Sequence, residues 1–157
     1  MAMEYDVPKC RPDTPPERCV HQIVSTTLAY NLYMVAPQGN YMRWQGTEGL
    51  ELIYAGGHCH APTCISMELW NDDTGELLCR NIATYGGTGA RTIAGTRFDE
   101  HGYLALPPCL WGSPEEELPP PILIPWNATI RAVKRSNSTY GHSGEMGLWQ
   151  MRGTIVE

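Results

Sequence analysis

The hydrophobic positions of this chain come in short alternating runs, separated by glycine, proline and polar turn residues. Ile65, Met67 and Leu69 alternate with Ser66 and Glu68, and a period of two is typical of a β-strand with one buried face. No stretch of helical length keeps an apolar period of 3.6 without a glycine or proline interrupting it. The pattern therefore predicts an all-β protein, built as an antiparallel β-sandwich or jelly roll.

The clearest predicted element is a hairpin over residues 64–83. Its first strand leads into Asn-Asp-Asp-Thr-Gly at residues 71–75, a strong turn signal, and Leu77 begins the return strand. Further strands are expected at 20–36, 50–58, 103–106, 122–124, 128–134 and 146–156. Irregular segments are expected at 1–18, 37–40, 86–89 and in the proline-rich stretch 107–125, all within a single domain over residues 1–157.

Cysteine usage points to an exported protein. The six cysteines are even in number and irregularly spaced, which is typical of a disulfide set. Residues 127–129 (Asn-Ala-Thr) and 137–139 (Asn-Ser-Thr) match the acceptor pattern for N-linked glycans. The chain begins without a signal peptide, so we expect a mature or recombinant form of a secreted protein. A cytosolic protein with six free thiols is the alternative.

The charge pattern bears on the choice of partner. The net charge is −6 and the chain holds two lysines, Lys9 and Lys134. Nucleic-acid binding needs a basic stripe, and docking on anionic membranes needs a basic cluster. We therefore expect neither nucleic acid nor a membrane surface as a partner, and no apolar run is long enough to span a bilayer.

His58-Cys59-His60 is the candidate functional site. Alternate residues of a strand share a face, so the two imidazoles form a bidentate metal platform while Cys59 points the other way. A disulfide suits Cys59, and Cys64, across an expected turn at Ala61-Pro62, is its natural partner. The alternative is a pair of histidines on a wet strand with no metal.

A third ligand must come from elsewhere in the chain. The remaining histidines are His21, His101 and His142, and Met146 lies in a glycine-rich segment near the C-terminus. Methionine is ordinarily a core filler. A thioether beside two imidazoles would instead select a soft ion, and copper, above all Cu(I), is the fitting choice.

The order of these motifs resembles a known family. The matching pieces are residues 19–21 (Cys-Val-His), 53–60, 76–79 and 142–149, the last of which contains Met146. They resemble the plant stress-up-regulated nodulin family, which is similar to the C-terminal domain of the copper type II, ascorbate-dependent monooxygenases. Peptidylglycine hydroxylating monooxygenase belongs to those enzymes. The resemblance covers most of the chain from Cys10 onward.

This resemblance implies a copper ion, cycling between Cu(I) and Cu(II), held by His58, His60 and Met146. In the monooxygenases a site of this kind binds dioxygen. His142 also matches the nodulin pattern and is an additional ligand candidate or a hydrogen-bonding partner behind the ligands, and His21 matches without an assigned role. The monooxygenases use two copper domains, whereas this chain has room for the second domain alone.

The cysteines depart from the nodulin pattern at one pair. Cys59 and Cys64 are absent from that pattern, and their joint presence implies a disulfide of their own. With that pair accepted, the simplest remainder is Cys10 with Cys19 and Cys79 with Cys109.

Two functions stay open. The first is a secreted mononuclear copper protein, catalytic or not, that would act on a small-molecule, peptide or glycan substrate with an external reductant. The second is a non-catalytic extracellular module that binds carbohydrate or peptide through aromatic side chains, although core packing is the simpler interpretation for most of them. The candidate residues for that module are Trp44, Trp70, Trp111, Trp126 and Trp149. A hydrolase is disfavoured because the chain has no Gly-x-Ser-x-Gly motif.

Overall fold

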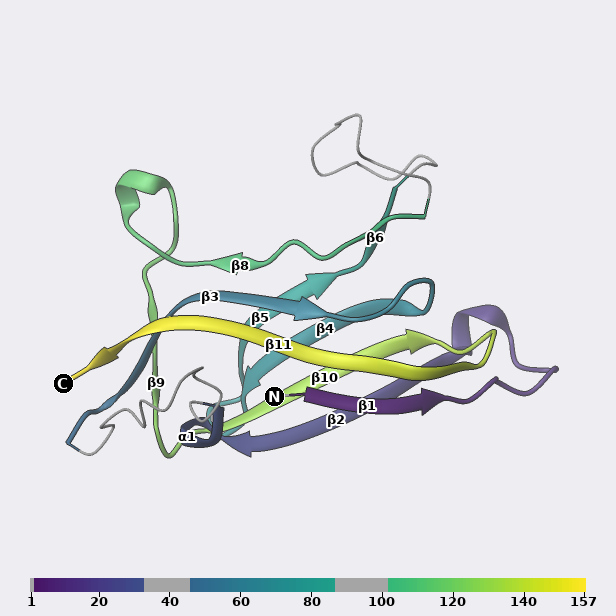
Figure 1. The fold of residues 1–157 in the computed structure, drawn as a ribbon, viewed down its shortest axis with the longest axis horizontal. Helices are drawn as coiled ribbons and strands as arrows, with labels where there is room; N and C mark the ends of the chain where they lie inside the picture. Colours follow the sequence, from purple (N-terminus) through teal and green to yellow (C-terminus); the bar gives the residue numbers. More distant parts are fainter. Residues whose placement is uncertain (1, 33–45, 87–101) are drawn as a thin grey trace.

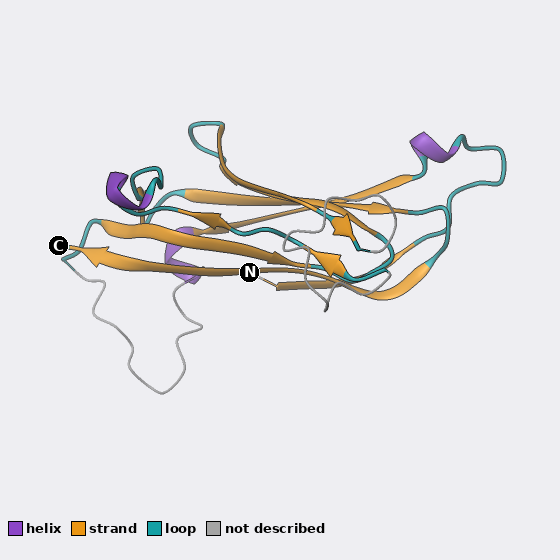
Figure 2. Ribbon diagram, turned by 90° about the horizontal axis from the view of Figure 1, so that it is seen from above, coloured by secondary structure: helices purple, strands orange, loops and turns teal. Residues whose placement is uncertain are grey.

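The computed structural model describes residues 2–32, 46–86 and 102–157. Most of these residues form antiparallel strands, as the alternating pattern predicts (Figure 1). The two main sheets lie over one another as layers (Figure 2). The all-β, antiparallel prediction is therefore confirmed and the layering is sandwich-like, while the finer jelly-roll topology stays a prediction.

The first sheet is organised around the long strand β11 (His142–Val156). Its order is β1 (Ala2–Val7), β11, β3 (Gly49–His58) and β8 (Cys109–Leu110), and β9 (Ile122–Pro125) also pairs with β3. The beginning of β11 pairs with β1, and the rest pairs with β3 on its other side. Leu148 is the crossover point, because it lies opposite both Ala2 and His58.

The second sheet has the order β2 (Val20–Leu28), β10 (Thr129–Asn137), β4 (Cys64–Asn71) and β5 (Glu76–Ile82). The pair β4–β5 is the predicted hairpin, and β6 (Thr84–Tyr85) pairs with β7 (Leu104–Ala105) as a small third sheet. The helical pieces are η1 (Pro16–Arg18), α1 (Ala29–Leu32) and η3 (Pro114–Glu116). Within the described ranges, none of these helices has the length and hydropathy needed to cross a membrane.

The core lies between the two main sheets. Its members come from the inward positions of both, among them Leu52, Ala55, Met67, Leu69, Ile130, Ala132 and Trp149. Three of the candidate platform tryptophans, Trp111, Trp126 and Trp149, are buried, which matches the core-packing interpretation. Three disulfides join Cys10 to Cys19, Cys59 to Cys64 and Cys79 to Cys109, so all three expected pairs are confirmed. Such a set suits an oxidising compartment.

Two expected irregular segments contain strands. Residues 2–7 of the predicted irregular segment 1–18 form β1, because Tyr5 and Val7 face inward while their neighbours face out and β11 supplies a partner. Within 107–125, β8 and β9 add to the edge of β3, where proline is tolerated because one side of the strand needs no donor. These pairings join residues far apart in the chain, so local composition does not reveal them.

Other expectations differ at their ends. The strand expected at 20–36 stops at Leu28, and Ala29–Leu32 forms one helical turn. The turn at 37–40, most of the loop at 86–89, His101 and Trp44 lie outside the described residues.

Candidate metal centre

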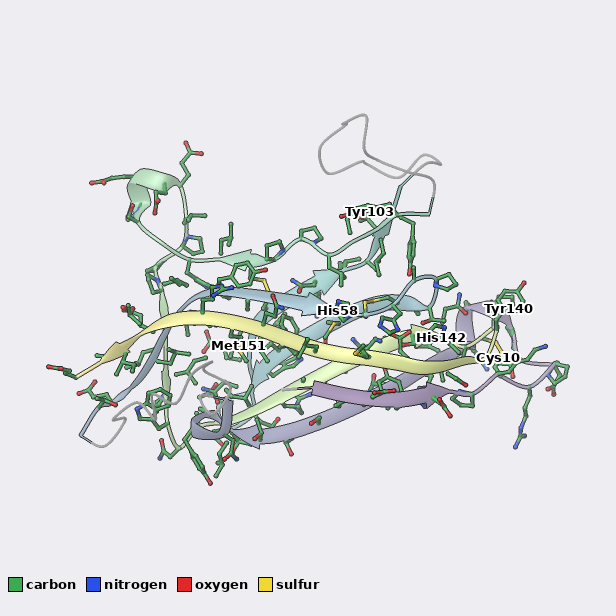
Figure 3. The ribbon with its side chains drawn as sticks, in the orientation of Figure 1. Cys10, His58, Tyr103, Tyr140, His142 and Met151 are labelled. Atoms are coloured by element: carbon green, nitrogen blue, oxygen red, sulfur yellow. A yellow bond between two sulfur atoms is a disulfide. The ribbon has the colours of Figure 1, made fainter. Side chains whose placement is uncertain are left out.

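His58 is the last residue of β3, and its neighbour Gly57 fixes the end of the strand against the second sheet. The Gly57 N–H donates to Asn81 Oδ1 at 2.7 Å, and Asn81 Nδ2 donates to the Pro107 carbonyl at 2.7 Å. A Cβ at Gly57 would lie 2.8 Å from Met67 Sδ, so glycine permits this close approach. His58 itself is exposed, near the place where β11 begins with His142 (Figure 3).

The strand expected to carry both imidazoles ends at His58, because β3 stops there and Cys59 and His60 follow it in a loop. Cys59 is buried and bonded to Cys64, whereas His58 is exposed and His60 half-buried. The two imidazole centroids lie 5.4 Å apart in an edge-on arrangement. Metal–nitrogen bonds of about 2.0 Å bring two imidazoles on one ion to a centroid separation of roughly 5 Å. The separation of His58 and His60 is therefore compatible with a shared ion.

Met146 lies on the same face of the first sheet as His58. Leu148 is directly opposite His58, and Met146 is two positions before Leu148 on β11. Burial alternates along β11 in agreement with this placement, because Glu145 and Gly147 are buried while Met146 between them is half-exposed. Diagonal neighbours of this kind lie about 7–8 Å apart, within reach of a long side chain.

His142 contacts His60 from the inner side of the sheet. Their ring centroids lie 5.9 Å apart. Gly144, with a φ of 68°, forms a bulge on β11, so that His142 pairs with Val7 and Glu145 pairs with Tyr5. His142 consequently faces inward, with its Nε2 3.7 Å from Glu145 Oε2, and stands behind His60 rather than beside Met146.

The predicted ligand set depends on the Met146 thioether. Across residues 2–32, 46–86 and 102–157, no group of three or more His, Cys, Asp or Glu side chains is arranged to hold a metal ion. The histidines alone therefore do not form a three-ligand site there. His21 lies on β2 of the second sheet, opposite Ser136, and its ring packs 5.9 Å from Tyr5. It belongs to the interior between the sheets and not to the face that carries His58.

A buried ion pair that was not predicted from the sequence lies directly behind this face. Lys134 and Glu145 are both fully buried and paired, and Thr63 Oγ1 also donates to Glu145. The signal was present, because Lys134 takes an inward position of β10, in step with Ile130 and Ala132. A charged side chain at an inward-facing position of a strand must be buried, and a buried charge indicates a nearby partner of opposite charge.

Burial and mutual hydrogen bonding shift the pKa values of both members of this pair. Burial by itself would raise the pKa of Glu145, but hydrogen bonds from Lys134, Thr63 and the His60 backbone outweigh it and hold the pKa below its ordinary value. Burial lowers the pKa of Lys134, and the neighbouring Glu145 carboxylate opposes that change.

No family model, no curated protein and no solved structure matches this chain. The likeness of its motifs to the nodulin family therefore stays a prediction.

Proposed function

We propose that this protein is a secreted mononuclear copper-binding protein whose ion is held by His58, His60 and Met146. The observation that carries the proposal is the β3–β11 register, which sets Met146 two positions from the residue opposite His58. The 5.4 Å separation of the two imidazoles adds support. Two imidazoles with one thioether suit copper, since sulfur favours Cu(I) and imidazole accepts both oxidation states.

The chain's own groups leave the ion accessible. His58 is exposed and Met146 half-exposed, so three protein ligands would leave coordination positions open to solvent or substrate. A bound copper ion would supply one-electron chemistry, and with dioxygen and an external reductant that chemistry would be of the monooxygenase type. The site we propose has one copper, half of the number that the monooxygenases use, so the second electron would come from a reductant in solution.

Export and glycosylation are part of the proposal. Three disulfides support an oxidising compartment. Asn127 and Asn137 are both exposed, just before β10 and at its end respectively. The Asn137 side-chain oxygen accepts the Thr139 N–H at 2.9 Å, which folds that acceptor triplet into a surface turn.

Metal analysis tests the proposal directly. Protein purified without chelator and titrated with Cu(II) should bind one equivalent and give a type 2 electron paramagnetic resonance signal that disappears on addition of ascorbate. The double variant His58→Ala/His60→Ala should lose this binding. His21→Ala, which removes an imidazole from the second sheet, should retain it.

Two results would count against this function. One is unchanged copper stoichiometry in the His58→Ala/His60→Ala variant. The other is full zinc occupancy of the purified protein with no uptake of copper.

The alternative function is a non-catalytic binding module, and Trp70 is its best support. Trp70 is half-buried on β4, and the Arg131 guanidinium lies 5.1 Å from its ring centroid. A glycan that binds metal-free protein and is lost in Trp70→Ala would favour this alternative. Because Trp111, Trp126 and Trp149 are buried, fewer tryptophans are available to bind a glycan than the five in the sequence.

A further inference from the structure

The ladder between β3 and β11 ends beside the candidate ligands. Its last pair is His58 with Leu148, and β3 stops at His58. The segment that carries His60 has therefore left the strand. Met146 continues on β11, so the relative position of these two residues must be fixed by other contacts.

The Glu145 carboxylate makes the connection. Its Oε1 accepts the backbone N–H of His60 at 2.8 Å and the backbone N–H of Met146 at 3.2 Å. The other oxygen accepts the Thr63 hydroxyl, three residues beyond His60. One buried side chain thus binds the loop that carries His60 at two points and the strand that carries Met146 at one.

Lys134 completes the arrangement from the second sheet. Its ammonium group pairs with Glu145 Oε1 and donates to the Met146 carbonyl at 2.6 Å. The Met146 backbone is therefore held on both sides, its N–H by Glu145 and its carbonyl by Lys134. Because β10 lies in the opposite layer, this pair ties both candidate ligands to the rigid interior of the sandwich.

Stability alone gives little reason for such a pair. Both side chains are fully buried, and removing two charges from water is costly. Apolar side chains of similar volume are often as stable or more stable at such positions. The remaining hydrogen bonds of this pair all go to the two segments that carry His60 and Met146, which fits a positioning role.

We propose that Glu145, held by Lys134, is the positioning residue that sets the distance between His60 and Met146 and thereby prepares the copper site. This inference rests on the proposed function for its metal. Its structural part, the anchoring of the His60 and Met146 backbones, is independent of metal. Outer partners of metal ligands commonly contribute 10- to 100-fold in affinity.

Two double variants separate positioning from charge. Lys134→Leu/Glu145→Leu removes both charges and every hydrogen bond of the pair. Lys134→Leu/Glu145→Gln also removes the charges, but its amide oxygen can still accept the His60 and Met146 N–H groups. Neither introduces a new thioether that could bind Cu(I). Circular dichroism would establish the fold of both variants.

The leucine variant should bind Cu(I) about 10- to 100-fold more weakly than the natural chain, with altered Cu(II) hyperfine splitting. The glutamine variant should recover affinity to within about threefold, since it restores the acceptor. Without metal, amide hydrogen exchange at His60 should be slow in the natural chain, fast in the leucine variant and slow again in the glutamine variant. Amides of the β4–β5 ladder, which contains neither substituted residue, serve as the internal reference.

Equal affinity and equal His60 exchange in the two variants would overturn the inference. So would free exchange of the His60 amide in the natural chain, a measurement that needs no variant to fold. If the leucine variant does not fold, weakening of the glutamine variant by more than about tenfold would overturn it as well. Absence of copper binding together with a protected His60 amide would count against the proposed function alone.

Discussion

Gly57 donates its backbone N–H to the side-chain oxygen of Asn81 at 2.7 Å, across the interior between the two main sheets. This bond joins β3 to β5 one residue before His58. Asn81 is itself held by the Pro107 carbonyl and is fully buried. The end of β3 is therefore fixed to the opposite layer at the position where the candidate site begins.

Replacing Gly57 by alanine should destabilise the protein and disturb His58. The new Cβ would lie 2.8 Å from Met67 Sδ and 2.9 Å from Asn81 Oδ1, closer than real contacts allow. Overpacking of this kind costs about 1–3 kcal/mol. Chemical denaturation would measure the decrease in the free energy of unfolding. Gly141→Ala is the control, because its Cβ would meet ordinary contacts of 3.6 Å, and a loss as large in that variant would contradict the explanation.

Met146→Leu should weaken Cu(I) binding more than Cu(II) binding. Leucine keeps the apolar volume and removes the thioether, the ligand that a soft ion prefers. The expected effect on the Cu(I) dissociation constant is on the order of tenfold, or about 1.4 kcal/mol. Competition with a chromophoric Cu(I) chelator measures it.

Met151→Leu is the matched control for that substitution. Met151 lies on the same strand but packs against the core, opposite Ala55. Its replacement should leave Cu(I) affinity unchanged. An equal loss in both variants would mean that the effect comes from the packing of β11 rather than from a ligand.

We expect the Cys79–Cys109 disulfide to contribute mainly to stability and the Cys59–Cys64 disulfide to contribute also to copper affinity. Cys59 and Cys64 close a loop with a sequence separation of 5, and Cys79 and Cys109 one of 30. Chain entropy predicts losses of about 2 and about 4 kcal/mol respectively when each pair is replaced by serine. The shorter loop contains His60, so its loss should weaken copper binding although it costs less stability.

Thermal unfolding and copper titration of the two paired variants would check this division. Retained copper affinity without the Cys59–Cys64 bond would show that the disulfide contributes only to stability. Loss of affinity in the Cys79→Ser/Cys109→Ser variant alone would reverse the assignment.

Stability should fall at acid pH partly through Glu68. Burial alone would raise the pKa of Glu68, but hydrogen bonds from Arg135 and Trp70, with the charges of Arg135 and Arg80, lower it below the ordinary 4.5. The unfolded chain then binds a proton more readily than the folded one. The contribution is complete above about pH 4.5 and is lost as the pH falls through the lower folded value.

Urea denaturation across an acid pH series would measure this dependence. Glu68→Gln should flatten the acid limb of the stability curve and lower stability near neutral pH. Glu76→Gln, an exposed change at the start of β5, should follow the natural chain. Identical curves for Glu68→Gln and the natural chain would contradict the prediction.

Local signals in the sequence predicted much of this molecule. The alternation of Ile65, Met67 and Leu69 and the turn at 71–75 gave the β4–β5 hairpin, since both depend on neighbouring residues. The short spacing of Cys59 and Cys64 likewise predicted their disulfide, which the structure contains.

Contacts between distant segments decided the rest. Residues 2–7 become a strand because β11 offers a partner about 140 positions later in the chain. The bulge at Gly144 turns His142 inward, and the alternation of polar and apolar residues in the sequence does not predict that bulge. The pairing of Lys134 with Glu145 joins consecutive strands, but it forms only because β10 and β11 lie in opposite layers with both side chains turned inward.

For the candidate site, the sequence by itself determined the chemistry of the donors and the Cys59–Cys64 pairing, because side-chain type and short spacing are local properties. The tertiary structure alone decided the register that sets Met146 near His58, the inward turn of His142 and the carboxylate that joins the two ligand segments. The physical reason is that strand register and interior ion pairing arise from packing between strands and between layers, which the pattern of one strand does not specify.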